Sequence, residues 1–132
     1  MIMKKYLSVV FILLFAFGCK KGNNVKPTGL TGAWELRSDY GGFAGGTRTY
    51  PPGNGTILQF NADSTFISYY KFQLGDHGTY QVVKNGIALG QQKFDGLYYN
   101  HNTYGTEIQL KGDTLTLGLD FDDMIATEYV RR

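Results

Sequence analysis

Disulfides, membrane-spanning helices and amphipathic helices are all missing from this sequence. It holds one cysteine in 132 residues, so no disulfide can form within the chain. Its longest apolar run covers about a dozen residues, whereas a helix needs about 20 to span a bilayer core of about 30 Å. No stretch longer than two turns follows the period of an amphipathic helix. These absences favour a small β-structure that is held together by packing alone.

The motifs that identify most enzymes are also absent. The two histidines, His77 and His101, fall in predicted loops, and Ser68 has no Gly-x-Ser-x-Gly sequence around it. The glycines between residues 41 and 46 lack the lysine and the helix start of a phosphate-binding loop. We therefore expect no catalytic residues and no enzymatic activity.

Spacing typical of a metal site is missing as well. Three aspartates near the C-terminus could offer oxygen ligands to Ca²⁺, but the spacing of an EF-hand and its glutamate are absent, which favours an ordinary polar turn. These residues are Asp120, Asp122 and Asp123. No cluster of histidines and cysteines has the spacing of a zinc site. We expect neither a metal ion nor another cofactor.

The first 18 residues have the pattern of an export signal. Two lysines precede an almost purely apolar stretch from Tyr6 to Phe17, and the small residues Ala16 and Gly18 stand before Cys19. A basic start, a short apolar run and small residues at the cleavage site are typical of a signal peptide. The sequence ending in Cys19 resembles the lipobox of bacterial lipoproteins, with Ala16 where Leu is usual. We expect residues 1–18 to be removed and Cys19 to carry diacylglycerol; an ordinary signal peptide or a buried anchor helix is the alternative.

Acyl chains on Cys19 would make the membrane the first partner of the protein, because each buried CH₂ contributes about 0.8 kcal/mol. The polar residues after it complete a tether that spans residues 19–28. The pair Lys20 and Lys21 differs from the acidic signal that directs some lipoproteins of Bacteroidota to the cell surface. We therefore expect an envelope protein on the outer membrane that faces the periplasm, with the cell surface as the alternative.

The charge of the remaining chain argues against nucleic acid as a partner. The whole sequence has a formal net charge of +2. From residue 29 onward, however, it has eight basic and eleven acidic residues, a net charge of −3. Nucleic-acid binding depends on basic surfaces that neutralise phosphates. A mildly acidic domain lacks that feature.

Residues 29–132 are predicted to form one domain of short β-strands. Apolar and polar residues alternate, and turn signals recur every 8–12 residues or so. Asn85-Gly86 is the strongest hairpin signal, because both residues tolerate the positive φ of a type I′ turn. A second turn is predicted at residues 75–78. The predicted strands are 32–37, 56–60, 65–72, 79–83, 87–89, 106–111, 114–119 and 124–131.

Eight strands joined by hairpins predict an all-β fold, an antiparallel up-and-down barrel. Closing the sheet buries one face and leaves no unpaired edge. The interior of an eight-stranded barrel is just wide enough to be filled by side chains or to hold one small ligand. A two-sheet sandwich is the alternative.

Several segments resemble, in order, the lipocalins and the lipocalin-like domains of Bacteroidota lipoproteins. The opening Gly32-Ala33-Trp34 matches their Gly-x-Trp motif, and the later segments are 58–66, 78–82, 113–117 and 129–131. The resemblance covers about residues 30–131 and implies a barrel that binds a ligand at its open end. In lipocalins a late arginine packs across the tryptophan and closes the barrel floor, which implies that role for Trp34 and Arg131. The chain lacks the disulfide and the final helix of longer lipocalins.

Aromatic residues supply the candidate ligand or partner surface. One cluster between predicted strands 87–89 and 106–111 mixes flat rings with amide and imidazole groups. Such a surface suits stacking on a sugar or contact with a protein partner, and a cover over the barrel end is the alternative. Together with two aromatic residues of the first long loop, the candidate rim is Phe43, Tyr50, Tyr98, Tyr99, His101 and Tyr104.

Two functional hypotheses follow from these patterns. The first is a membrane-anchored lipoprotein whose barrel binds a small apolar or glycan ligand. The second is a protein-interaction or inhibitor lipoprotein with a solidly packed barrel. Bulky residues at predicted inward positions, such as Trp34, Phe60 and Tyr80, favour a filled interior.

Overall fold

The computed structural model describes residues 29–118 and 124–132, and the regular structure in them is entirely β-strand. The predicted signal peptide, Cys19, the tether and the three aspartates near the C-terminus lie outside the described residues. The strands are β1 (Gly32–Gly41), β2 (Thr47–Thr49), β3 (Ile57–Phe60), β4 (Thr65–Tyr70), β5 (Gln73–Leu89), β6 (Gln92–Tyr99), β7 (Thr106–Lys111), β8 (Thr114–Leu117) and β9 (Ile125–Arg131). Within the described ranges, no helix has the length and apolar character needed to cross a membrane.

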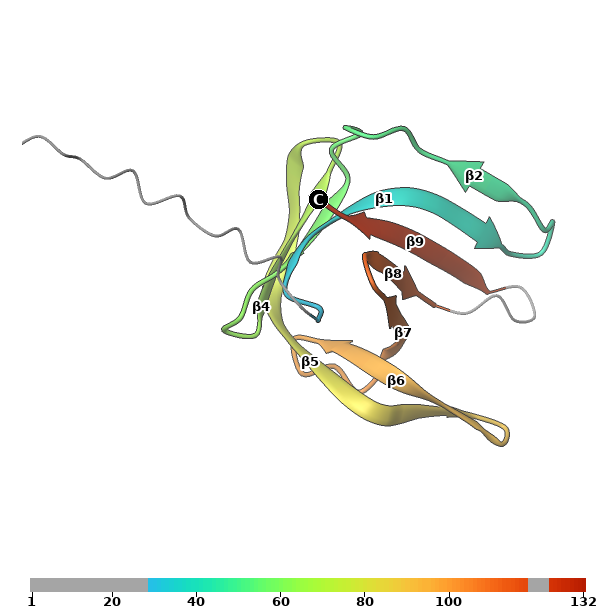
Figure 1. Ribbon diagram of the computed structural model, residues 1–132. Helices are drawn as coiled ribbons and strands as arrows, with labels where there is room; N and C mark the ends of the chain where they lie inside the picture. Colours follow the sequence, from blue (N-terminus) through green and yellow to red (C-terminus); the bar gives the residue numbers. More distant parts are fainter. Residues whose placement is uncertain (1–28, 119–123) are drawn as a thin grey trace, which may run out of the picture.

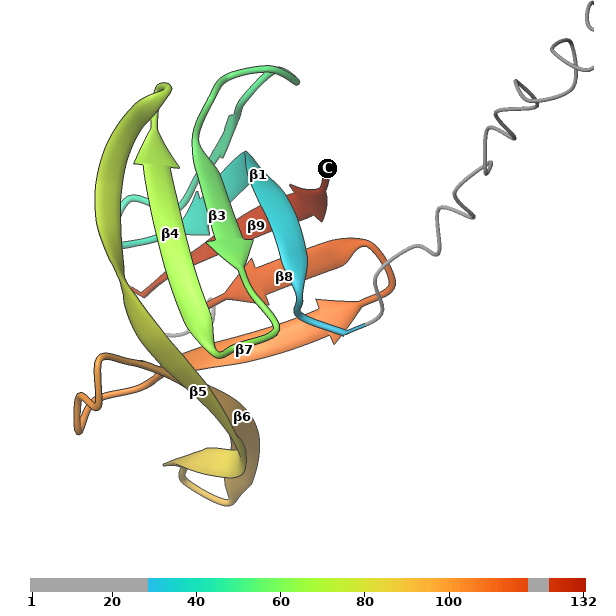
Figure 2. The same cartoon turned by 90° about the vertical axis from the view of Figure 1, so that its left-hand side faces the viewer.

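Eight of the strands close into a single antiparallel barrel (Figures 1 and 2). They follow the order β1-β3-β4-β5-β6-β7-β8-β9, and β9 pairs again with β1. The extra strand β2 pairs with the distal part of β1, at Ser38 to Tyr40. Closure pairs both edge strands of the sheet with each other. The predicted eight-stranded up-and-down barrel is confirmed, and the two-sheet sandwich does not form.

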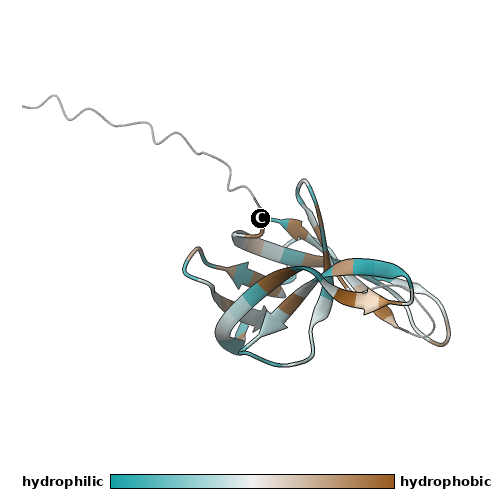
Figure 3. Cartoon of the chain, turned by 90° about the horizontal axis from the view of Figure 1, so that it is seen from below, coloured by the Kyte–Doolittle hydropathy of each residue, from teal (hydrophilic) through white to brown (hydrophobic). Residues whose placement is uncertain are grey.

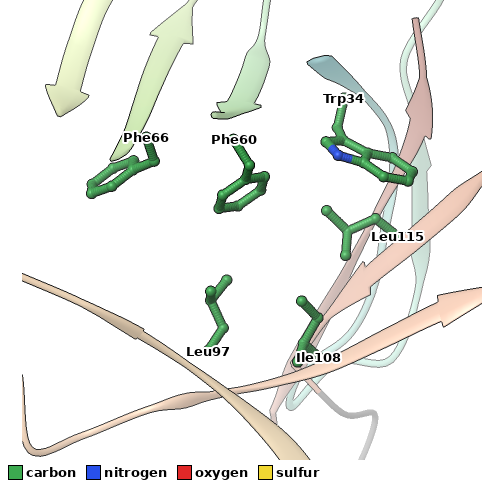
Figure 4. Packing of buried hydrophobic residues seen from close by; sticks show 6 residues of the cluster. All are labelled: Trp34, Phe60, Phe66, Leu97, Ile108 and Leu115. Atoms are coloured by element: carbon green, nitrogen blue, oxygen red, sulfur yellow. The ribbon is translucent and has the colours of Figure 1, made fainter. Parts of the chain in front are cut away.

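The hydrophobic core occupies the inside of this barrel. Alternate residues of a strand point to opposite faces, so hydrophobic and hydrophilic colours alternate along the ribbons in Figure 3. Six buried side chains, each from a different strand, converge in Figure 4: Trp34, Phe60, Phe66, Leu97, Ile108 and Leu115. Partly buried residues surround them: Leu30, Leu58, Tyr80, Tyr99, Leu117 and Tyr129. Burial of these surfaces is the main stabilising term in a barrel without a disulfide.

One end of the barrel is closed by Trp34 and Arg131. Trp34 is fully buried, and its Nε1 donates a hydrogen bond of 2.8 Å to the carbonyl oxygen of Leu30. The guanidinium carbon of Arg131 lies 4.2 Å from the centroid of the Trp34 ring. Gly32 makes room for this arrangement, because a Cβ there would lie 2.8 Å from Nη1 of Arg131. The Gly-x-Trp motif therefore has a steric cause.

The Arg131 side chain also joins segments that are far apart in the sequence. Its Nη1 and Nη2 donate to the carbonyl oxygens of Thr31 and Gly29 at 2.8 and 2.6 Å. Its Nε lies 3.2 Å from Oδ1 of Asp113 in the β7–β8 turn. Only 5% of the side chain is exposed, so these contacts are largely shielded from water. We call this end the barrel floor.

A bulge in β1 decides which residues face the interior beyond the core. The pairing with β9 shifts register between Leu36 and Ser38, which inserts one extra residue on the β1 side. Because of the shift, Asp39 pairs with Thr127, on the inward face that Tyr129 also occupies. Without the bulge, Asp39 would point outward.

The outward face of β1 buries a charged residue. Glu35 is 2% exposed, and its Oε2 lies 2.7 Å from Nη1 of Arg37 and accepts a hydrogen bond from the N–H of Gly53. Burial acts to raise the pKa of Glu35, but Arg37 and the backbone N–H groups of Gly53 and Gly55 together outweigh it, and the pKa lies below its ordinary value. The loop around Gly53 is thus held against the barrel wall.

The predicted turns at Asn85-Gly86 and at residues 75–78 are wrong, because β5 runs without a break through both. Asn85 does have a positive φ of 52°, but it lies in a bulge where the β5–β6 register shifts between Val83 and Ile87. Side chains satisfy the bulged backbone: the N–H of Asn85 donates to Asp95 Oδ1, and the carbonyl of Gly86 accepts from the Tyr98 hydroxyl. The true two-residue turn follows Leu89, and the β5–β6 hairpin projects beyond the barrel in Figures 1 and 2.

Other elements differ from the sequence prediction as well. The predicted strands 79–83 and 87–89 belong to one strand, β5, and the strand β6 was not predicted. The predicted glycine-rich loop contains the short strand β2, whose three residues are all exposed and so show no burial pattern. The strand predicted over residues 65–72 ends at Tyr70, because Lys71 and Phe72 both adopt positive φ and form the turn to β5.

Replacing Trp34 with alanine should lower the free energy of unfolding by about 3–5 kcal/mol, because a fully buried ring is lost beneath Arg131. Urea denaturation followed by far-UV circular dichroism measures this, since Trp34 is the only tryptophan and its fluorescence is lost with it. The matched control is Tyr104→Ala. Tyr104 is 91% exposed, and its loss should change stability by less than about 0.5 kcal/mol. Equal denaturation midpoints for the two variants would contradict the buried placement.

Candidate functional site

The end of the barrel opposite the floor, which we call the mouth, is open to water. Tyr70 lies at the mouth end of β4 and is 61% exposed. The distal part of β1, with Asp39, reaches the same end. Polar groups at the mouth can therefore meet a ligand from solution.

Asp39 is the central polar group of the mouth. Its Oδ2 accepts a hydrogen bond of 2.8 Å from the Tyr50 hydroxyl and lies 3.6 Å from Nη2 of Arg48. The Asp39 side chain is 17% exposed, whereas that of Arg48 is 77% exposed. An exposed pair of this kind is weak, so Arg48 is a replaceable partner for the carboxylate. The hydrogen bond to Asp39, with a contribution from burial, raises the pKa of Tyr50.

A hollow of about 240 Å³ adjoins this carboxylate between β1, β2 and β9. It is lined by Asp39, Tyr40, Gly41, Gly45, Gly46, Thr47, Arg48 and Ile125.

Two phenols lie deeper on the inward face. Burial, with the charge of Asp39 and the neighbouring Tyr50, raises the pKa of Tyr129 to about 12. Burial and the nearby Tyr129 also raise the pKa of Tyr99. Within the described part of the chain, no group hydrogen-bonds to either hydroxyl. The mouth thus combines one carboxylate with two neutral phenols that have hydrogen-bonding capacity left.

A larger hollow, of about 560 Å³, lies on the outer face of β5 and β6. It is lined by Ser64, Thr79, Tyr80, Gln81, Val83, Tyr98, His101 and Asn102. Its position is outside the barrel, because Tyr98 pairs with Gln81 on the face opposite to Tyr99 and Tyr80. We call it the outer hollow.

The Tyr98 ring is fixed in place at the outer hollow. It packs over Gly96 and Gly105, where an added Cβ would lie 2.7 and 2.6 Å from ring carbons. Its hydroxyl donates a hydrogen bond of 3.0 Å to the carbonyl of Gly86. The missing side chains at these two glycines are therefore what admits the ring.

The six residues of the predicted rim do not gather around one hollow. Tyr98 and His101 line the outer hollow, and Tyr50 bonds to Asp39 at the mouth. Tyr99 turns inward and packs on Phe66, with ring centroids 4.5 Å apart. Two more, Phe43 and Tyr104, are 93% and 91% exposed. Adjacent strand residues point to opposite faces, so a continuous aromatic segment divides between two surfaces.

Sequence reasoning missed Asp39, Gln81 and Ser64 as site residues. Asp39 faces the interior only because of the bulge in β1. No sequence motif near Asp39 predicts that bulge. Gln81 and Ser64 come together because Ser64 accepts a backbone hydrogen bond from Tyr80, across the β4–β5 pairing. Gln81 could have been predicted only with the β5–β6 register, because it pairs with Tyr98 and its side chain therefore lies on the same face.

Metal ligands do not cluster in the described residues: no group of three or more histidine, cysteine, aspartate or glutamate side chains could hold an ion there. The candidate Ca²⁺ ligands of the sequence analysis lie outside these residues.

Comparisons with known proteins give no relative for this chain: no family model, no curated protein and no solved structure matches it. The mouth and the outer hollow are therefore the features that bear on its function.

Stability should fall as the pH rises from 10 to about 12. A phenol in the unfolded chain ionises near pH 10, whereas Tyr129 in the folded barrel keeps its proton until about pH 12. The unfolded state therefore binds fewer protons in this window, and Tyr129 contributes a loss of about 1 kcal/mol per pH unit. Urea denaturation between about pH 8 and 12 measures the effect. Tyr129→Phe should flatten this part of the profile, whereas the exposed control Tyr104→Phe should not. Identical profiles for the two variants would contradict the assignment.

Proposed function

We propose that the protein is a binding module that takes a small, largely apolar ligand with a polar head in the mouth of its barrel. The observation that carries this proposal is the inward Asp39 carboxylate above the two phenols of Tyr99 and Tyr129. Small-molecule sites combine apolar walls with a few placed polar groups, and the mouth has both.

The chemistry of the mouth favours a ligand head that donates hydrogen bonds or carries positive charge. Asp39 is an acceptor, and its cationic partner Arg48 is mostly in water and 3.6 Å away. A ligand ammonium or hydroxyl could replace Arg48 at little cost. The rings of Tyr99 and Tyr129 then offer apolar surface to the ligand body.

We also propose that this module is held on a membrane by a lipid on Cys19, as the lipobox-like sequence suggests. The course of the chain supports such an arrangement. Gly29 lies beside Arg131 at the floor, and β1 runs from there to the mouth. A barrel tethered through residues 19–28 would turn its floor toward the membrane and leave the mouth in the aqueous phase.

A second candidate function is binding of a protein partner at the mouth. Exposed apolar side chains lie on the turns and the adjoining strand ends here, which is unusual for a surface that stays in water. They are Phe43 at 93%, Phe72 at 70%, Leu74 at 66% and Ile125 at 55% exposure. In this case the loops, and not the barrel interior, would carry the affinity.

The ligand-binding proposal is tested with 2-phenylethylamine and its neutral analogue 2-phenylethanol, titrated into the full chain by NMR. The amine should bind about tenfold more tightly than the alcohol, because it can pair with Asp39. Asp39→Asn should remove this preference. The control Asp63→Asn, at the β3–β4 turn near the floor, should keep it. Absence of binding by both compounds would contradict the proposal and leave the protein-partner function.

The lipid anchor is tested by cell fractionation. Cys19→Ser should move the protein from the membrane fraction to the soluble fraction, because no thiol remains for the acyl chains. Circular dichroism should show the same β-structure, since the strands of the barrel begin at Gly32. Retention of the variant in the membrane fraction would refute the anchor.

A further inference from the structure

We propose that the outer hollow is a second binding site, separate from the mouth, and that its ligand is a neutral sugar. The hollow is the larger of the two surface depressions described above, and its volume of about 560 Å³ lies within the range of small-molecule sites, about 300–1,000 Å³. It lies on the outside of the barrel wall, so a ligand there does not compete for the interior.

The character of the lining excludes strongly charged ligands. Among its eight residues there is no lysine, arginine, aspartate or glutamate. A phosphate or carboxylate ligand would lose its hydration without meeting a cation, which is costly. A neutral ligand with many hydroxyl groups avoids this cost.

Polar side chains of the lining have hydrogen-bonding capacity to spare. Gln81, His101 and Asn102 each bring an amide or imidazole group, and Ser64 and Thr79 bring hydroxyls. Within the described residues, these side-chain groups make no hydrogen bonds to other protein atoms. Together they supply both donors and acceptors, which the hydroxyls of a sugar ring can use.

Tyr98 adds the apolar element that sugars use. The C–H groups of a pyranose ring pack on a flat aromatic side chain, while the ring hydroxyls point to polar neighbours. Tyr98 is held by the two glycines beneath its ring and by its bond to Gly86, so little side-chain freedom is lost on binding.

The loop beside the hollow is also fixed before any ligand arrives. The N–H of Asn100 donates to the carbonyl of Thr79 at 2.8 Å, and its Oδ1 accepts from the N–H of Thr79 at 2.9 Å. Asn102 is also held in place, because its N–H donates to the carbonyl of Tyr99. Asn100 and His101 adopt positive φ, of 50° and 59°, and form a tight turn directly after β6. Such a preorganised loop favours specific binding over non-specific binding.

The experiment is a ¹H–¹⁵N NMR titration of the full chain with five sugars: D-glucose, D-galactose, N-acetyl-D-glucosamine, maltose and cellobiose. We expect at least one to shift the amide signals of Gln81, Tyr98 and Asn102, with a dissociation constant on the order of 1 mM. Tyr98→Ala should weaken this binding at least tenfold, and Gln81→Ala, at an exposed position where folding is not at risk, should weaken it several-fold.

Two controls separate this site from the mouth and from general effects. Tyr104→Ala removes an exposed tyrosine of the same loop that does not line the hollow, and it should bind sugar like the native chain. Asp39→Asn should also leave sugar binding unchanged while it alters amine binding at the mouth. The proposal is overturned if no sugar shifts these signals, if the shifts fall on Asp39, Thr127 and Tyr129 instead, or if Gln81→Ala binds as well as the native chain.

Discussion

The stacking of Arg131 on Trp34 is the contact on which the remaining architecture depends. Closing a barrel requires the last strand to return to the first, and this pair lies where β9 meets β1, with Trp34 directly opposite Arg131 in the register. The same guanidinium binds the entering chain through Thr31 and the β7–β8 turn through Asp113. A cation held over an indole and away from water is worth more than one at an exposed site. In a chain without a disulfide, four segments are thereby joined at one buried point.

A closed floor leaves the mouth as the end at which the proposed ligand would enter. The core side chains occupy the inside of the barrel next to Trp34, and the opposite end meets water, where Tyr70 at the end of β4 is 61% exposed. The bulge in β1 then places a carboxylate, Asp39, at that end. One extra residue in one strand thus changes the mouth from an apolar opening to one with a specific polar group, without disturbing the closure between Trp34 and Arg131.

Local alternation was enough to predict the fold class, since inward residues such as Trp34, Phe60 and Leu115 follow the period of two and meet in the core. Features that depend on how the strands pair, such as bulges and register, were not predictable. Asn85-Gly86 has the composition of a hairpin, but Asp95 and Tyr98 on the neighbouring strand satisfy its backbone, and a bulge forms instead. The predicted rim residues are split between two faces for the same reason. The register between strands decides which side chains share a face, and it cannot be deduced from one segment alone.

Tyr98 and Tyr99 show what this division means for function. As neighbours on β6 they point to opposite sides of the wall, Tyr99 toward the core and the mouth, Tyr98 toward the outer hollow. Gly96 and Gly105 leave room only for the outer ring, and Phe60 and Phe66 define the place of the inner one. The two surfaces therefore share a backbone but differ in chemistry: one contains a carboxylate, the other contains no charged side chain. A ligand at the mouth and a ligand in the outer hollow would therefore meet different polar groups, Asp39 in the first case and Gln81 in the second.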